Sequence, residues 1–207
     1  MDVQTGLLVA VEGQSGVGKS TVARLMAERL GRAGRRVLLT TTPSSSPIGT
    51  LARAGTFRLQ GAELALLVAA DRHHHARTVI RPAVDAGSIV LCDRYLASAL
   101  VLDPLDGVEP ALVRAVYRGL PPAHLTVVLE GSPQLCATRA ASRGLYSRFH
   151  TPDPRDNERE QAAYRAIVDE LRRDGCLVVV HGIGDADPEM VARDVVDLIL
   201  DHEDREP

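Results

Sequence analysis

Short, nearly all apolar segments recur along the chain and alternate with longer segments in which apolar residues follow a helical period. The apolar segments lie at residues 7–11, 36–40, 88–92, 125–130 and 176–180. Runs of this kind, rich in valine, leucine and isoleucine, are typical of strands that are buried on both faces of a parallel sheet. The pattern therefore predicts five parallel strands.

The segments between the predicted strands carry the signals of helices. Helices are predicted at residues 19–30, 61–86, 157–173 and 188–200. Pro82 predicts a bend in the second helix, and Asp187 followed by Pro188 is typical of a helix start. The chain is therefore expected to form a three-layer α/β domain, with the sheet flanked by helices.

Two stretches follow neither pattern. Residues 41–49 read TTPSSSPIG, and residues 144–157 read GLYSRFHTPDPRDN. Their serine, proline and glycine content is typical of surface loops, although both lie where loops that handle phosphate would sit. No internal repeat or linker is visible. The sequence therefore predicts a single domain over residues 1–207 with a mobile lid at about residues 143–157.

Composition excludes several classes of partner. The net charge is −3 and the arginines are scattered, which does not predict the basic face of a nucleic-acid-binding protein. The longest apolar run, LALLVAA, is far too short to span a membrane. The first residues, MDVQTG, lack the features of a signal peptide. We expect neither nucleic acid nor a membrane as a partner.

The cysteines and the histidine run do not predict a metal centre. Cys92, Cys136 and Cys176 are widely spaced and odd in number, so a reducing compartment such as the cytoplasm is expected. Three consecutive histidines occupy residues 73–75. Neighbouring positions of a helix point about 100° apart, so these side chains cannot share one ion. We expect a solvated or partly packed helix surface there.

The segment GQSGVGKS directly follows the first predicted strand and opens the first predicted helix. It matches the phosphate-binding pattern G-x-x-x-x-G-K-[ST] in the setting that this loop requires. Glycines let successive N–H groups turn inward around phosphate oxygens, and the helix adds its positive end. The residues predicted to bind ATP are Gly13, Gln14, Ser15, Gly16, Val17, Gly18, Lys19, Ser20 and Thr21.

A phosphate-binding loop needs a carboxylate on the far side of Mg²⁺, at the end of a neighbouring strand. Asp93 comes directly after the third apolar segment. One aspartate after a strand is also typical of an ordinary turn, but together with the loop it predicts a Mg²⁺ site formed by Ser20 and Asp93. Arg94 adjoins it and is a candidate ligand for a second phosphate.

Arginines also gather in the segment ATRAASRGLYSRFH. Arg139 and Arg143 are four residues apart on one predicted helix face, and Arg148 lies beyond a glycine. A segment of this kind can close over ATP and spread charge off the transferred phosphoryl group. Taken alone, the segment is slightly more typical of a solvated basic helix end.

These segments together resemble the thymidylate kinase family of nucleoside monophosphate kinases. The family's EGxDGxGKST appears as EGQSGVGKST, its LLFAADR…VIRPAL…G as LLVAADRHHHARTVIRPAVDAG, its DRYxxS as DRYLAS, and its lid RxRGxxDRFE as RAASRGLYSRFH. The resemblance covers residues 7 to about 170 in the family's order. It implies ATP and Mg²⁺, a nucleotide as phosphoryl acceptor, and a homodimer formed through the helix at residues 61–86.

The resemblance also implies roles for individual residues. Arg94 would bind the acceptor's phosphate, Arg72 would face its base, and the lid arginines would act on ATP. Gly16 stands where some members carry a loop arginine, so the chain resembles the type that places this arginine in the lid. The catalytic candidates are Lys19, Asp93, Arg94, Arg143 and Arg148. The acceptor-site candidates are Arg72, Arg94, Val68, Ser98 and Thr42.

Departures from the family pattern concentrate on the acceptor side. Ser15 replaces the loop aspartate that contacts the acceptor's sugar, Val68 replaces the phenylalanine that stacks on thymine, and Leu102 stands where many members have a sugar-excluding tyrosine. The charged pair of the family's REPGGTP loop is replaced by threonines, and the lid's acidic residues are Ser147 and His150. We therefore expect dTMP to be held weakly.

Two classes of function follow. The first is an ATP-dependent kinase acting on dTMP or a dTMP-like nucleotide, or on another small metabolite of a specialised biosynthetic pathway. The second is a non-catalytic nucleotide-binding protein. The retained Lys19, Ser20 and Asp93 favour the kinase, whereas the missing carboxylate at Ser15 favours the binding protein.

Overall fold

The computed structural model describes residues 6–143, 149, 152–184 and 187–203. Within them, five strands form one parallel sheet in the order β2-β3-β1-β4-β5. The strands are β1 (Leu7–Gly13), β2 (Val37–Thr41), β3 (Ile89–Asp93), β4 (Leu125–Gly131) and β5 (Val178–Ile183). The prediction of five parallel strands is confirmed. Because the strands are parallel, Gly13, Asp93 and Gly131 end at one edge of the sheet.

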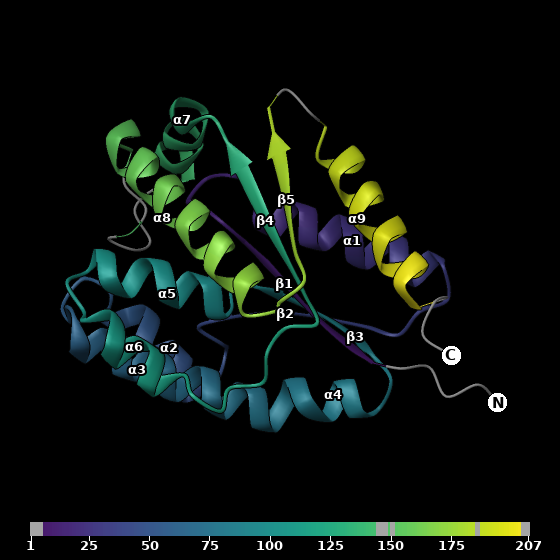
Figure 1. Cartoon of the computed structure of the whole chain (residues 1–207), viewed down its shortest axis with the longest axis horizontal. Helices are drawn as coiled ribbons and strands as arrows, with labels where there is room; N and C mark the ends of the chain where they lie inside the picture. The colour runs from purple at the N-terminus through teal and green to yellow at the C-terminus, as the bar shows by residue number, and fades with distance from the viewer. Residues whose placement is uncertain (1–5, 144–148, 150–151, 185–186, 204–207) are drawn as a thin grey trace.

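Helices cover both faces of the sheet. They are α1 (Lys19–Arg32), α2 (Pro47–Gly55), α3 (Ala62–His75), the π-helix η1 (Ala76–Ile80), α4 (Arg81–Asp85), α5 (Leu96–Leu105), α6 (Pro110–Val116), α7 (Pro133–Arg143), α8 (Pro154–Arg173) and α9 (Pro188–Glu203). Figure 1 shows α1 and α9 on one side of the sheet and α5 and α8 on the other. The three-layer α/β architecture is therefore confirmed.

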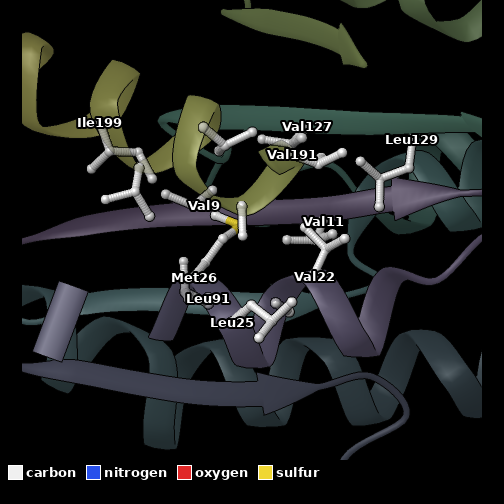
Figure 2. Close-up of a cluster of buried hydrophobic side chains, with 14 of the residues drawn as sticks. Val9, Val11, Val22, Leu25, Met26, Leu91, Val127, Leu129, Val191 and Ile199 are labelled. Carbon is white, nitrogen blue, oxygen red and sulfur yellow. The ribbon is translucent and has the colours of Figure 1, made fainter. Parts of the chain in front are cut away.

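Side chains along β1 point alternately to the two faces of the sheet, and this divides the core into two layers. Its odd-numbered residues pack against α1 and α9, where Val9 meets Met26 and Val191 (Figure 2). Its even-numbered residues, Leu8 and Ala10, pack toward the opposite face, in a cluster with residues of α3, η1, α5 and α6. A central strand with both faces covered is why the run LLVAV is apolar at every position.

The sequence prediction was wrong for the burial of the edge strands and incomplete for the long helix. β2 and β5 lie at the edges of the sheet; no residue of β2 is fully buried, and β5 is buried only at Val178 and Ile183. The predicted helix at residues 61–86 is continuous, but its irregularity is the π-helical turn at residues 76–80, ahead of Pro82. Pro82 itself sits in the first turn of α4, where its missing N–H costs little.

The stretch at residues 41–49 is only partly exposed. Thr42 and Ser44 are buried, and α2 begins at Pro47 with the Ser46 side chain accepting a hydrogen bond from the N–H of Gly49 at 3.0 Å. Asp71 of α3 holds the stretch, since its carboxylate accepts from the N–H and the hydroxyl of Ser44, each at 2.6 Å. The loop is thereby fixed against α3.

The remaining expectations concern histidines, cysteines and membranes. His73 and His74 are partly buried and His75 is buried, with its Nε2 2.7 Å from the Thr40 hydroxyl, so the histidine run is packed rather than solvated. All three cysteines are unpaired. No helix in the described part of the chain is both long enough and apolar enough to cross a membrane.

Candidate active site

The loop between β1 and α1 has the geometry of a phosphate-binding loop. Gly13, Gly16 and Gly18 have positive φ angles of 131°, 78° and 108°. A Cβ atom at Gly13 would lie 2.3 Å from the carbonyl oxygen of Leu129, and one at Gly16 would lie 2.2 Å from that of Cys136. Position 16 is therefore closed to any side chain unless the backbone moves, and the loop must rely on N–H groups and the helix end to bind anions.

Lys19, the first residue of α1, is only 6% exposed. Its ammonium group donates to the carbonyl oxygens of Gly13 at 2.7 Å and Gln14 at 2.9 Å. Burial, together with the nearby positive charge of Arg94, lowers its pKa from 10.5 to about 8. A desolvated cation in this position gains most when an anionic phosphate joins it.

Ser20 and Asp93 meet across the mouth of the loop. The Ser20 hydroxyl donates to the Asp93 carboxylate at 2.5 Å, although 73 residues separate them in the chain. A hydroxyl and a carboxylate are oxygen ligands of the kind that Mg²⁺ prefers, and Mg²⁺ is commonly held by one or two such groups with the rest supplied by phosphates and water. These two residues fit the predicted Mg²⁺ site. Thr21 follows in α1 and is partly buried.

Arg94 adopts a positive φ of 67°, which is rare for a residue with a side chain and costs about 1–3 kcal/mol. Its guanidinium donates to the Ser98 hydroxyl at 3.3 Å, and that hydroxyl in turn donates to Glu12 at 2.5 Å. Burial opposes the charge, but Tyr164 and nearby carboxylates, Glu160 foremost among them, raise the pKa of Arg94 above its ordinary value. The cation is thus held in one fixed orientation.

Glu12 organises this region from inside the sheet. Its side chain is fully buried and accepts from the backbone N–H groups of Tyr95 at 2.8 Å and Ser98 at 3.2 Å, where α5 begins. Ser98, which the sequence assigned to the acceptor, lies behind Arg94, and its hydroxyl is also 2.9 Å from that of Tyr164. We interpret Ser98 as a residue that positions Arg94.

Arg72 and Thr42 form the opposite wall. Arg72 is 3% exposed; its Nε donates to the Thr42 hydroxyl at 3.0 Å, and its Nη1 donates to the Tyr117 hydroxyl at 2.7 Å. The Thr42 hydroxyl donates to the carbonyl oxygen of Arg94 at 2.8 Å. Arg72 also lies over the ring of Tyr117, 5.4 Å from its centroid. Both arginines are therefore linked through Thr42.

A single cleft of about 280 Å³ is bordered by Lys19, Ser20, Thr42, Arg72, Asp93, Arg94 and Ser98. Lys19 and Ser20 lie at its phosphate-loop end, and Val68 and Leu102 line it on the acceptor side. Asp103 also lines the cleft, and burial, partly opposed by Arg72, raises its pKa to about 6. The lining residues are Gly16, Gly18, Lys19, Ser20, Thr41, Thr42, Pro43, Arg53, Thr56, Leu64, Val68, Arg72, Asp93, Arg94, Ser98, Leu102, Asp103 and Phe149.

A second carboxylate reaches the phosphate-binding loop from α8. The N–H of Ser15 donates to Glu160 at 2.9 Å, and both residues are at least 95% buried. Glu160 and Asn157 line a recess of about 200 Å³ that shares Leu102 and Phe149 with the main cleft. Helix α8 thus forms part of the site.

The structure brings together most of the predicted site residues and leaves two undescribed. Arg143 ends α7, but its side chain, like all of Arg148, lies outside the described residues. The predicted lid also lies outside them at residues 144–148 and 150–151, whereas residues 154–157 form the first turn of α8.

Several residues of the site were missed from the sequence, among them Glu12, Glu160 and Asp103. Glu12 had a signal, since it is a charged residue in an otherwise apolar strand. Glu160 also had one, because it shares a buried stripe of α8 with Tyr164 and Val168. Asp103 had none, as the helix that carries it, α5, was not predicted.

The fold and this cleft together define a P-loop kinase, because phosphoryl transfer from a nucleotide is the chemistry that a loop lysine, a Mg²⁺ site and facing arginines support.

Comparison with known proteins shows to which family of P-loop kinases the chain is similar. The family model described as thymidylate kinase matches residues 11–182. Thymidylate kinase of Nitrobacter winogradskyi is 38% identical over 92% of this chain and 86% of its own length. Two other relatives are also 38% identical. A probable thymidylate kinase of Caldivirga maquilingensis matches over 69% of this chain and 72% of its own length, and the thymidylate kinase of Xanthomonas euvesicatoria matches over 72% of this chain and 67% of its own length. The chain belongs to the thymidylate kinase family and is an ATP-dependent nucleoside monophosphate kinase.

Proposed function

We propose that this chain transfers the γ-phosphoryl group of Mg²⁺-bound ATP to the phosphate of dTMP, giving ADP and dTDP. The observation that carries the proposal is the single cleft in which Lys19 and the Ser20–Asp93 pair lie at one end and Arg94 and Arg72 border the rest. The relatives that bear the name thymidylate kinase support the choice of acceptor.

The phosphate-binding loop acts on the donor nucleotide. Its N–H groups and the start of α1 would hold the phosphates, and Lys19 would exchange the carbonyl oxygens of Gly13 and Gln14 for phosphate oxygens. Mg²⁺, held by Ser20 and Asp93, would neutralise charge on the phosphates when bound. The loop's own residues thereby position the γ-phosphorus for in-line attack.

Arg94 acts on the acceptor. Its strained backbone and its contact with Ser98 fix the guanidinium before any ligand arrives. A preorganised donor does not have to reorient during the reaction, which is the main source of electrostatic catalysis. The attacking phosphate oxygen of dTMP would be held against the γ-phosphorus, while Arg72 hydrogen-bonds the pyrimidine.

On the basis of the family resemblance, we also propose a closing lid and a homodimer. Arg143 and Arg148 would close over ATP as charge leaves the transferred phosphoryl group, within a single domain whose lid spans about residues 143–157. A homodimer formed through the helix at residues 61–86, which comprises α3, η1 and α4, is supported by Leu66, which is 48% exposed on α3. We also expect the protein in the cytoplasm. Light scattering after gel filtration would test the dimer.

The test is ADP release over a panel of acceptors: dTMP, dUMP, UMP, dCMP and small alcohols without a base. The proposal expects dTMP to be among the best acceptors and the alcohols to be inactive. Turnover of a non-nucleotide acceptor with none of the nucleotides would overturn it, and so would ATP binding with no acceptor-dependent turnover.

A further inference from the structure

Three polar side-chain atoms lie unsatisfied where the phosphate-binding loop meets α8. Ser15, Asn157 and Glu160 are 2%, 2% and 5% exposed. In the described part of the chain, the Ser15 Oγ, the Asn157 Oδ1 and the Glu160 Oε1 atoms are buried and have no hydrogen-bond partner. A buried acceptor without a donor destabilises the fold, and more so when it is charged, so native proteins leave few of them. Three together indicate a place for a ligand.

Glu160 is held so that one of its oxygens remains available. The N–H of Ser15 binds Oε2 at 2.9 Å and fixes the carboxylate, which leaves Oε1 free. Asn157 lies one turn earlier on the same buried face of α8. Both side chains line the recess that joins the main cleft at Leu102 and Phe149. A ligand group in the cleft can therefore reach them.

The charges nearby decide what kind of group fits. Two acceptors and a hydroxyl call for a hydrogen-bond donor, either neutral or cationic. Glu160 already has cations in its surroundings, because it raises the pKa of both Arg94 and Lys19. The recess is also lined by Asp106, Asp156 and Arg159. A hydroxyl group would supply the missing donor to Glu160 without adding charge to this mixed surface.

We propose that Glu160, with Asn157 and Ser15 beside it, is a specificity residue that accepts a hydrogen bond from a sugar hydroxyl of the acceptor. This inference rests on the proposed function. With its phosphate at Arg94 and its base at Arg72, a nucleotide has its sugar between them, beside the recess. The sugar of dTMP carries a single free hydroxyl, at the 3′ position, so the 3′-hydroxyl is the group that Glu160 binds.

The experiment compares dTMP with 3′-deoxythymidine monophosphate, which keeps the base and the reacting phosphate. It measures kcat/KM for both in the wild type, in Glu160→Gln, and in Glu158→Gln, an exposed glutamate on the same helix. A hydrogen bond to a charged group contributes about 1.5–3 kcal/mol, so the wild type and Glu158→Gln should prefer dTMP by about 10- to 150-fold. Glu160→Gln should lose most of that preference, because its kcat/KM for dTMP falls by a larger factor than its kcat/KM for the 3′-deoxy analogue, whatever the change common to both nucleotides.

Each other outcome overturns the inference in a recognisable way. If the wild type uses both nucleotides equally well, or if Glu160→Gln keeps the full preference, Glu160 does not bind the hydroxyl and dTMP remains the acceptor. If the wild type does not turn over dTMP at all, the proposed function fails together with the inference. Should Glu160→Gln not fold, Asn157→Ala, on the same recess, must show a smaller loss of the same preference; an unchanged preference there overturns the inference.

Discussion

The two halves of the cleft are built in different ways. The ATP half comes almost entirely from one continuous segment, residues 13–21, with Asp93 added from β3, the strand beside β1 in the sheet. The acceptor half is assembled from Thr42, Arg72, Arg94 and residues of α5 and α8, which are far apart in the chain. Phosphate is bound by backbone and helix ends and so leaves a short motif. Acceptor recognition depends on tertiary packing. The residues that bind the acceptor can therefore come from different helices or strands while the fold stays the same.

The largest expected effect lies in the ATP half. Lys19→Met should leave a folded protein, because methionine can fill the buried site, but it should lower kcat by about 10²–10³-fold since one preorganised electrostatic contact is lost. Steady-state ADP release with dTMP measures it, and a thermal melt checks the fold. Near-normal turnover by a folded variant would show that the loop lysine is not catalytic.

The same lysine should make ATP binding depend on pH. Burial lowers its pKa to about 8 in the free protein, so the cation that ATP needs is progressively lost above that pH. The Kd for ATP should weaken by about tenfold between pH 8 and pH 9.5, and Lys19→Met should show no such change. Equal slopes for the two proteins would place the titrating group elsewhere.

A smaller effect is expected in the acceptor half. Val68 lines the cleft without an aromatic ring, so Val68→Phe should raise kcat/KM for dTMP by about 2- to 10-fold, the range expected from about 0.5–1.5 kcal/mol of stacking. Leu198→Phe on α9, where Leu198 is 38% exposed, is the control and should change nothing. A gain by both variants would mean that the effect does not come from a ring beside the base.

The smallest effect concerns stability. Burial raises the pKa of Asp103 from 3.8 to about 6, so the folded protein holds this proton more tightly than the unfolded chain. Its stabilising contribution is full below about pH 4 and is lost as the pH rises through about 6. Asp103→Asn should therefore melt a few degrees above the wild type at pH 8, and the difference should shrink toward pH 5. The exposed Asp169→Asn should show no such trend.

The contrast between the two halves also explains what the sequence could predict. The apolar runs predicted all five strands, but not that β2 and β5 are half-covered edges, because burial at an edge depends on strand order. The glycine pattern predicted the loop. Position 15 alone indicated that no carboxylate reaches the acceptor's sugar, whereas the fold brings Glu160 to within 2.9 Å of the Ser15 nitrogen from 145 residues away. No local pattern contains such a contact.

Transfer of the γ-phosphoryl group from ATP to dTMP within one cleft is the reaction on which the other conclusions depend. The most direct test incubates the protein with γ-labelled ATP, Mg²⁺ and dTMP and identifies the labelled product, with Lys19→Met as the inactive control. We expect labelled dTDP to form only when both dTMP and Mg²⁺ are present, and to be nearly absent when Lys19→Met replaces the wild type. Label found only in inorganic phosphate, or in a product whose yield is the same for both proteins, would contradict it.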